Sequence, residues 1–125
     1  MATQIGNIGG IDVASRRASF AVLPALDAHG TVVPASGLRL EQAGNLARFE
    51  QKLPAGAQDT AIYALPGGGR AFVADVPGRV PGSKAIYEKQ VNLHGETMQY
   101  TKTTIAPDGN IVHVKDKIHG TEVKP

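Results

Sequence analysis

From Asp59 to the C-terminus, the sequence consists of short runs rich in β-branched and aromatic residues, with turn-forming residues between them. Such runs are typical of an antiparallel sheet in which each strand pairs with the next. The strongest turn is 107–110, because proline fixes φ at its first central position, aspartate suits the second, and glycine takes a left-handed conformation. The pattern predicts five strands: 60–65, 70–76, 84–93, 96–106 and 110–118.

Three further turn segments fit this arrangement. Gly67-Gly68-Gly69 predicts a hairpin loop whose backbone angles are unusual for other residues. The segment 77–82 contains two prolines and two glycines, which predicts a rigid connector without regular secondary structure. His94-Gly95 is expected to join the third and fourth strands as a two-residue loop, with a positive φ at the histidine.

One helix is predicted ahead of the sheet, over residues 40–53. Pro54 ends it, since proline disfavours helical geometry in the preceding residue and cannot donate a backbone hydrogen bond. The helix is amphipathic and should pack on the sheet. The predicted fold class is therefore α+β, one helix on an antiparallel meander of about five strands. One helix face carries Ala43, Leu46, Phe49 or Glu50, and Leu53, and the other faces carry Glu41, Asn45, Arg48 and Lys52.

Residues 1–37 differ from the remainder in combining many glycines with short apolar pieces at 18–23 and 31–33. We expect a loosely ordered leader with one or two short strands, followed by a helix-plus-sheet domain over 38–125. A chain of 125 residues can bury about two-thirds of its surface, so one domain needs no covalent staple. Cysteine is absent, which excludes disulfides, thiolate metal sites and a cysteine nucleophile.

The apolar stretches are far shorter than the ~20 residues that cross a bilayer. The first ten residues lack a basic segment followed by an apolar one, so we expect neither membrane insertion nor a secretion signal. Net charge is +2, and its surplus lies in residues 70–125, with eight basic and six acidic residues, against five and five in 1–69. A basic surplus suits a polyanionic partner, although lysines that only solvate the outer face of a sheet give the same count.

The expected loop at 107–109 fixes the register of the last two strands. With three residues and a bulge at its glycine, it places Thr103 opposite His113 and Thr101 opposite Lys115. A change of one residue in the pairing would move all the side chains of a strand to the other face.

The expected loop at 94–95 fixes the preceding pair. It places Glu88 opposite Thr101 and Ile86 opposite Thr103. One face would then carry an acid, an imidazole, a cation and two hydroxyls within a few strand spacings of ~4.8 Å. This set suits metal-independent transphosphorylation of RNA, in which one group deprotonates a ribose 2′-hydroxyl, another protonates the leaving 5′-oxygen, and cations balance the developing charge.

The predicted roles follow from these side-chain types. Glu88 is the expected base and His113 the expected acid, Lys115 with Arg79 or Lys102 would clamp the phosphate, and Thr101 and Thr103 would orient it. The candidate catalytic set is His113, Glu88, Lys115 and Thr103. The candidate substrate-binding set is Arg79, Lys102, Thr101 and Tyr87.

Ordinary structural roles are the alternative for most of these residues. The run 101–104 is also usual strand composition, and His113 between two valines suits the outer face of a half-buried strand. The histidines lack the spacing of a metal-binding helix or finger, and 67–70 lacks the features of a phosphate-binding loop, so no metal or cofactor is predicted.

Three segments stand out within about 46–117: VPGRVPGSKAIYEK at 76–89, YTKTT at 100–104 and DGNIVHVK at 108–115. With them, this part of the chain resembles the C-terminal effector domains of bacterial polymorphic toxins, which end Rhs-repeat or filamentous-haemagglutinin-like proteins. The resemblance is a pattern of strand and turn sequences, with no complete catalytic motif.

The resemblance implies a setting and a fold. Such domains are exported as part of a larger toxin, delivered into the cytoplasm of a competing bacterium, and blocked in the producer by a cognate immunity protein. Many are ribonucleases similar to barnase and the colicin ribonucleases, with a helix packed on an antiparallel sheet that holds the site. RNA is thus the expected substrate. Two alternatives stay open: an ADP-ribosyltransferase anchored by Arg70 or Arg79 with Glu88, and a non-catalytic binding or immunity-like module.

Overall fold

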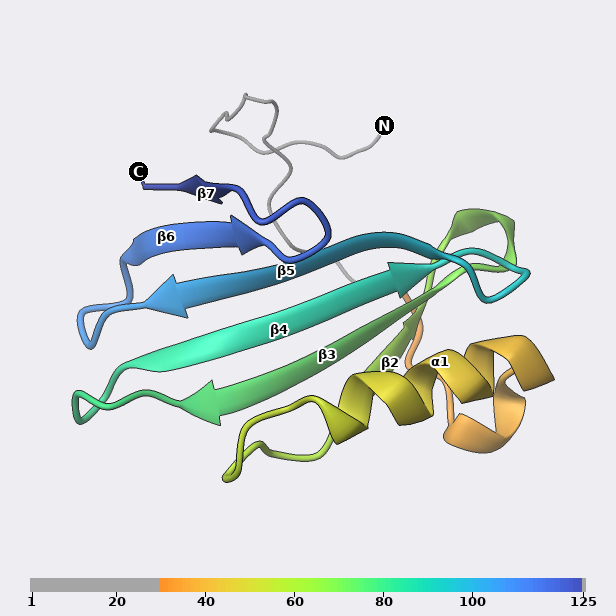
Figure 1. Cartoon of the computed structure of the whole chain (residues 1–125). Helices are drawn as coiled ribbons and strands as arrows, with labels where there is room; N and C mark the ends of the chain where they lie inside the picture. The colour runs from red at the N-terminus through yellow and green to blue at the C-terminus, as the bar shows by residue number, and fades with distance from the viewer. Residues whose placement is uncertain (1–29, 125) are drawn as a thin grey trace.

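The computed structural model describes residues 30–124, which form one helix packed on a six-stranded antiparallel sheet (Figure 1). Every strand pairs with the next in the chain, so the sheet is a meander. The predicted α+β class and the meander are confirmed, and the sixth strand is additional. The strands are β2 (Ala61–Ala64), β3 (Arg70–Pro77), β4 (Lys84–Val91), β5 (Thr97–Ile105), β6 (Ile111–Asp116) and β7 (Glu122–Val123).

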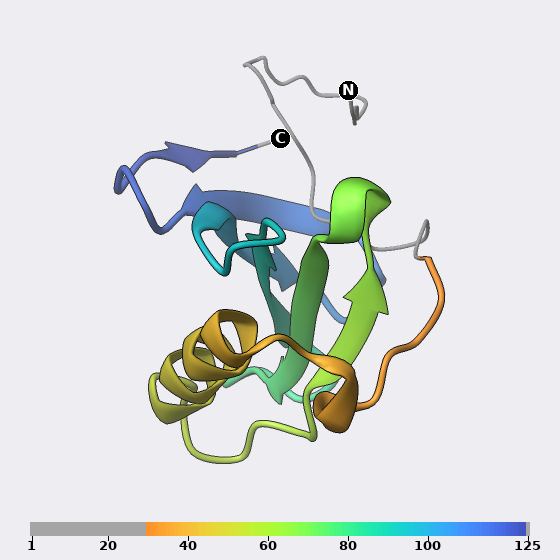
Figure 2. The same cartoon turned by 90° about the vertical axis from the view of Figure 1, so that its right-hand side faces the viewer.

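Helix α1 (Leu40–Gln51) lies on one side of this sheet, against β3 and β4 (Figure 2). It ends two residues before the predicted limit, with Lys52 as its C-cap. Leu46 and Phe49 face the sheet as expected, but the prediction for Asn45 is wrong, because this side chain is buried. We call the side of the sheet under α1 the helix face and the opposite side the far face.

Two buried amides attach α1 to distant loops. Gln42 donates from Nε2 to the carbonyl oxygens of Gly68 (3.0 Å) and Asn92 (3.2 Å). Asn45 donates from Nδ2 to the carbonyl oxygen of Gly95 (2.9 Å) and to Oγ1 of Thr97 (3.1 Å). Buried polar groups are stable only when they are hydrogen-bonded, so these contacts fix the position of the helix on the sheet.

The core lies between α1 and the helix face. Phe49 and Phe72 are fully buried, with ring centroids 6.0 Å apart, and Phe49 lies 5.9 Å from the ring of Tyr100. Aliphatic and aromatic residues of α1 and of β2 to β5 complete the cluster: Leu46, Ile62, Ala74, Val76, Tyr87 and Val91.

The β4–β5 connection reaches the predicted register by a different route. Asn92 pairs with Glu96, leaving a three-residue loop, so the predicted two-residue loop is wrong. A bulge between β4 and β5 then shifts the register by one residue, and Glu88 pairs with Thr101 as expected. The two irregularities cancel each other.

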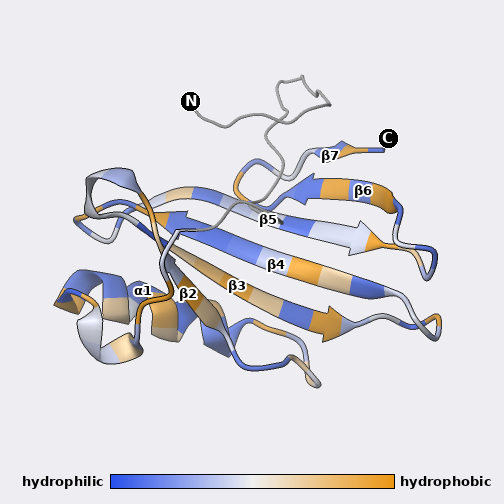
Figure 3. Cartoon of the chain, turned by 180° about the vertical axis from the view of Figure 1, so that it is seen from behind, coloured by the Kyte–Doolittle hydropathy of each residue, from blue (hydrophilic) through white to orange (hydrophobic). Residues whose placement is uncertain are grey.

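The β5–β6 connection does not compensate in this way. Gly109 has a φ of 90°, and Ile105 pairs with Ile111, both as the expected turn requires. The register then shifts, because Val112 is an extra residue in β6, and His113 pairs with Thr104. The predicted pairings of His113 with Thr103 and of Lys115 with Thr101 are therefore wrong. This bulge moves His113 and Lys115 to the helix face, whereas the far face, seen in Figure 3, carries Glu88, Thr101 and Thr103.

The predicted leader is described only from residue 30 onward. Thr31 to Val33 run beside β2, where Val33 donates its backbone N–H to the carbonyl oxygen of Ile62 at 2.9 Å. The predicted strand at 18–23 lies outside the described residues. Over residues 30–124, no helix combines the length and the apolar character needed to cross a membrane.

Candidate functional site

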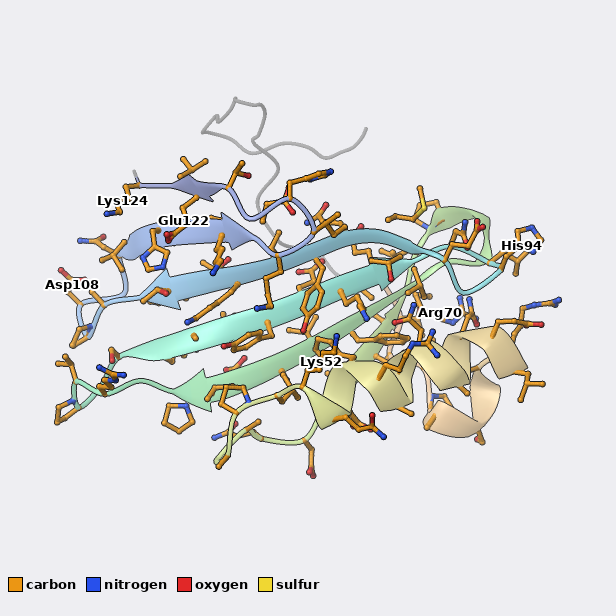
Figure 4. The ribbon with its side chains drawn as sticks, in the orientation of Figure 1. Lys52, Arg70, His94, Asp108, Glu122 and Lys124 are labelled. Carbon is orange, nitrogen blue, oxygen red and sulfur yellow. The ribbon has the colours of Figure 1, made fainter. Side chains whose placement is uncertain are left out.

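Basic side chains gather on the part of the helix face that α1 leaves uncovered. The register puts Lys102 of β5 opposite Lys115 of β6 on this face, with Lys89 of β4 opposite Tyr100 in the next row. Lys117 follows β6, and its backbone N–H donates to the carbonyl oxygen of Tyr100 at 2.8 Å. Figure 4 shows this face, with Lys52 at the C-terminal end of α1. We define the basic face as Arg48, Lys52, Lys89, Lys102, Lys115 and Lys117.

The rings of Tyr87 and Tyr100 lie beneath these cations, and we call these two rings the tyrosine floor. The ammonium nitrogen of Lys117 lies 5.7 Å from the ring centroid of Tyr87 and 5.5 Å from that of Tyr100. Lys102 lies 5.8 Å from the Tyr87 ring, and Lys89 lies 4.9 Å from the Tyr100 ring. Ring faces attract cations, and this attraction offsets part of the repulsion among the lysines.

Among residues 30–124, no carboxylate forms an ion pair with a cation of the basic face, and the nearest strand neighbour of this kind is Glu122 opposite Lys115. Among residues 30–124, the ion pairs join Lys84 to Asp75 (3.4 Å) and His119 to Asp116 (2.7 Å), and neither includes a cation of the basic face. An array of ammonium groups without carboxylate partners is an electrostatic site for anions.

Burial and, after it, the repulsion of neighbouring cations lower the pKa values of two lysines. Burial lowers the pKa of Lys89 below its usual 10.5, and the charges of Arg48 and Lys52 lower it further. Burial also lowers the pKa of Lys117, followed by the charges of Lys115, Lys102 and Lys52. A bound anion would favour the charged form of both lysines.

The lowered pKa of Lys117 predicts a pH-dependent stability. At pH values below its folded-state pKa, Lys117 is charged in both the folded and the unfolded chain. The full cost of placing this charge in the folded protein then lowers the free energy of unfolding. Between that pKa and 10.5, the unfolded chain binds more protons, so the free energy of unfolding should rise with pH. For Lys117→Met, the free energy of unfolding should rise less over the same pH range. Denaturant unfolding of both proteins at several alkaline pH values measures the difference, and parallel curves would contradict the lowered pKa of Lys117.

An imidazole lies at the edge of the basic face. His113 follows the bulge in β6, opposite Thr104, and its Nε2 is 3.3 Å from the Thr104 Oγ1. Lys115 is two residues further along the same strand and therefore on the same face. The imidazole can exchange a proton near a bound anion, and the hydroxyl holds its orientation.

The predicted catalytic set is divided between the two faces. His113 and Lys115 lie on the helix face, whereas Glu88 and Thr103 lie on the far face, where both are fully buried. Glu88 accepts a hydrogen bond from Nε2 of Gln90 at 2.6 Å. Glu88 and His113 cannot transfer protons to one substrate across a sheet, so the predicted acid–base pair is not formed.

The predicted substrate-binding set is also divided. Lys102 and Tyr87 belong to the helix face, and Thr101 is buried on the far face. Arg79 is exposed in the connection between β3 and β4. The anchors weighed for an ADP-ribosyltransferase do not meet either, because Arg70 belongs to the helix face and Glu88 to the far face. Within residues 30–124, no group of three histidine, aspartate or glutamate side chains is placed to hold a metal ion.

The sequence prediction missed Arg48, Lys52, Lys89, Lys117 and Tyr100 as site residues. Two signals could have indicated all of these except Lys117. Across β4 and β5, Tyr87 pairs with Lys102 and Lys89 pairs with Tyr100. Basic residues interleaved with aromatic ones are typical of nucleic-acid-binding surfaces. Arg48 and Lys52 follow each other at a spacing of one helical turn in the last part of α1.

Comparison of the chain with protein-family models, with curated proteins and with solved structures found no match.

Proposed function

We propose that this chain is the RNA-cleaving effector domain of a bacterial polymorphic toxin, exported within a larger protein and delivered into the cytoplasm of a competing cell. A cognate immunity protein would protect the producer. The observation that carries the proposal is the basic face, where lysines without carboxylate partners among residues 30–124 lie over Tyr87 and Tyr100. Phosphodiesters bind to such cation arrays, and the sequence resemblance supplies the setting.

The fold supports the same proposal. The order of one helix followed by an antiparallel meander agrees with the order that the resemblance to barnase and the colicin ribonucleases implies. A shared plan is compatible with many activities, so the reaction depends on the side chains of the face.

The proposed reaction is transphosphorylation by the 2′-hydroxyl. His113 accepts the 2′-hydroxyl proton, the 2′-oxygen bonds to phosphorus, and the bond from phosphorus to the 5′-oxygen breaks. Lys102 and Lys115, which pair across β5 and β6, balance the charge on the phosphorus centre, and one ammonium protonates the leaving oxygen. The products are a 2′,3′-cyclic phosphate and a free 5′-hydroxyl. Glu88, Thr101 and Thr103 take no part, because they lie on the far face.

The test is incubation of the purified protein with tRNA and total RNA in EDTA. The native chain should cleave RNA, and His113→Ala should lower the rate by about 10²- to 10⁴-fold, the usual effect of removing a proton-transfer group. His94→Ala is the matched control, because His94 is exposed in the β4–β5 turn. This variant should cleave RNA at the native rate. Intact RNA with the folded native chain would contradict the proposal.

Expression in a bacterium provides a second measurement. The native chain should arrest growth, and His113→Ala should relieve the arrest while its circular dichroism spectrum stays native. Normal growth of cells that express the native chain without an immunity partner would favour a non-catalytic binding module. Dependence on NAD, with label transferred to protein or RNA, would favour an ADP-ribosyltransferase.

A further inference from the structure

The cations of the basic face form a track that crosses the strands. It begins with Arg48 and Lys52 at the end of α1, continues through Lys89 on β4 and Lys102 on β5, and ends at Lys115 on β6. Adjacent strands are ~4.8 Å apart, so the part on the sheet is about 10 Å long. A flexible chain of phosphates can follow such a line, with successive phosphates on successive strands.

Both ends of the track are bounded. Helix α1, with a diameter of about 10 to 12 Å, stands above the sheet over β3 and β4 (Figures 1 and 2). On the other side, β7 places Glu122 opposite Lys115, so negative charge begins immediately beyond β6. The open basic surface is therefore only about three strands wide. Proteins that recognise duplex RNA contact successive grooves along a long helix, which requires a far more extended surface.

The tyrosine floor favours unpaired bases. Tyr87 and Tyr100 are 7 % and 9 % exposed, and the ammonium group of Lys117 lies 5.7 and 5.5 Å from their ring centroids. A phosphate that draws this ammonium aside would expose the ring faces, on which unpaired bases stack irrespective of sequence. Bases within a duplex are already stacked on their neighbours and cannot reach the rings.

We infer that the ligand of the basic face is single-stranded RNA, with its backbone crossing β4 to β6 from α1 and its unpaired bases on Tyr87 and Tyr100. This inference rests on the proposed action on RNA. It adds a short binding site and the stacking of unpaired bases on Tyr87 and Tyr100, neither of which the net charge of the chain requires.

The experiment uses 2′-O-methyl oligonucleotides, which have no free 2′-hydroxyl and are not cleaved. A labelled 10-mer is titrated with the full chain by fluorescence anisotropy, as a single strand and as the blunt duplex of the same sequence. The single strand should bind at least tenfold more tightly, with log K falling by about 2 to 3 per decade of salt if three or four phosphates are neutralised. Equal or tighter binding of the duplex, or binding of neither form, would overturn the inference. RNA cleavage in EDTA is a separate measurement and shows independently whether the proposed function fails.

Intrinsic fluorescence tests the position of the bases. The chain has three tyrosines and no tryptophan, so its emission is tyrosine emission. The single strand should quench it, and Tyr63→Phe should show the same quenching of the remaining emission, because Tyr63 belongs to the far face. Tight binding without quenching would overturn the stacking on Tyr87 and Tyr100.

Discussion

Replacing Phe49 by alanine is expected to lower the free energy of unfolding by about 3 to 5 kcal/mol, the usual cost of deleting a buried phenylalanine ring. Phe49 is fully buried and contacts both Phe72 and Tyr100, so no neighbouring side chain of α1 replaces its contacts with the sheet. Small domains are stable by about 5 to 15 kcal/mol in total, and the loss would leave a marginal fold. Urea unfolding followed by circular dichroism measures it.

Glu50→Ala is the matched control for this experiment. Glu50 is the next residue of the same helix and is exposed, so its removal should change the free energy of unfolding by less than about 0.5 kcal/mol. A loss below about 1 kcal/mol for Phe49→Ala would mean that α1 does not depend on this contact. The hydrogen bonds of the Gln42 and Asn45 side-chain amides would then be the main attachment of the helix.

The second large effect concerns RNA affinity. The double variant Lys102→Met, Lys117→Met is expected to bind a single-stranded oligonucleotide at least 100-fold more weakly than the native chain. A hydrogen bond between charged groups contributes about 1.5 to 3 kcal/mol, and 1.4 kcal/mol corresponds to a factor of ten, so each lysine should account for about tenfold or more. Methionine keeps most of the apolar stem over the tyrosine rings, which limits the change to charge.

The binding isotherms of each single variant, the double variant and Lys84→Met decide this prediction. Lys84 lies on the far face, where it pairs with Asp75, and its replacement should change affinity by less than about twofold. The salt dependence should become shallower by about 0.7 for each phosphate contact that is lost. Similar losses for Lys84→Met and Lys102→Met would show that net charge, and not the basic face, determines binding.

Local sequence signals predicted the elements of this fold well. Apolar spacing and Pro54 located α1 to within two residues of its end, and glycine-rich turns separated the first five strands near their observed limits. These features follow from backbone sterics and from side-chain periodicity, which act over a few residues and can be read directly. The buried amides could not be predicted in the same way. Gln42 and Asn45 are polar, and their carbonyl partners lie 26 and 50 residues away in the chain.

The candidate site shows the limit of such reasoning more clearly. The turn at His94-Gly95 predicted the correct pairing of Glu88 only by coincidence. The loop is one residue longer than predicted, and the bulge between β4 and β5 reverses the resulting shift in register. At the next turn, the extra residue Val112 is not compensated, and the imidazole moves to the face opposite Glu88. Valine has no local preference for a bulge that would distinguish it from its neighbours in β6, so the sequence gives no sign of this shift.

By itself, the sequence determined the α+β class, the order of the helix and the first five strands, the chemistry of their turns, and a surplus of basic residues in the second half. Only the tertiary structure decided which side chains share a face. In an extended strand, one unpaired residue reverses the direction of all later side chains, and the cost of a bulge depends on how both faces pack. For this reason His113 and Lys115 lie on the same face as the lysines and tyrosines of β4 and β5, while Glu88 and its threonine neighbours are buried on the other side.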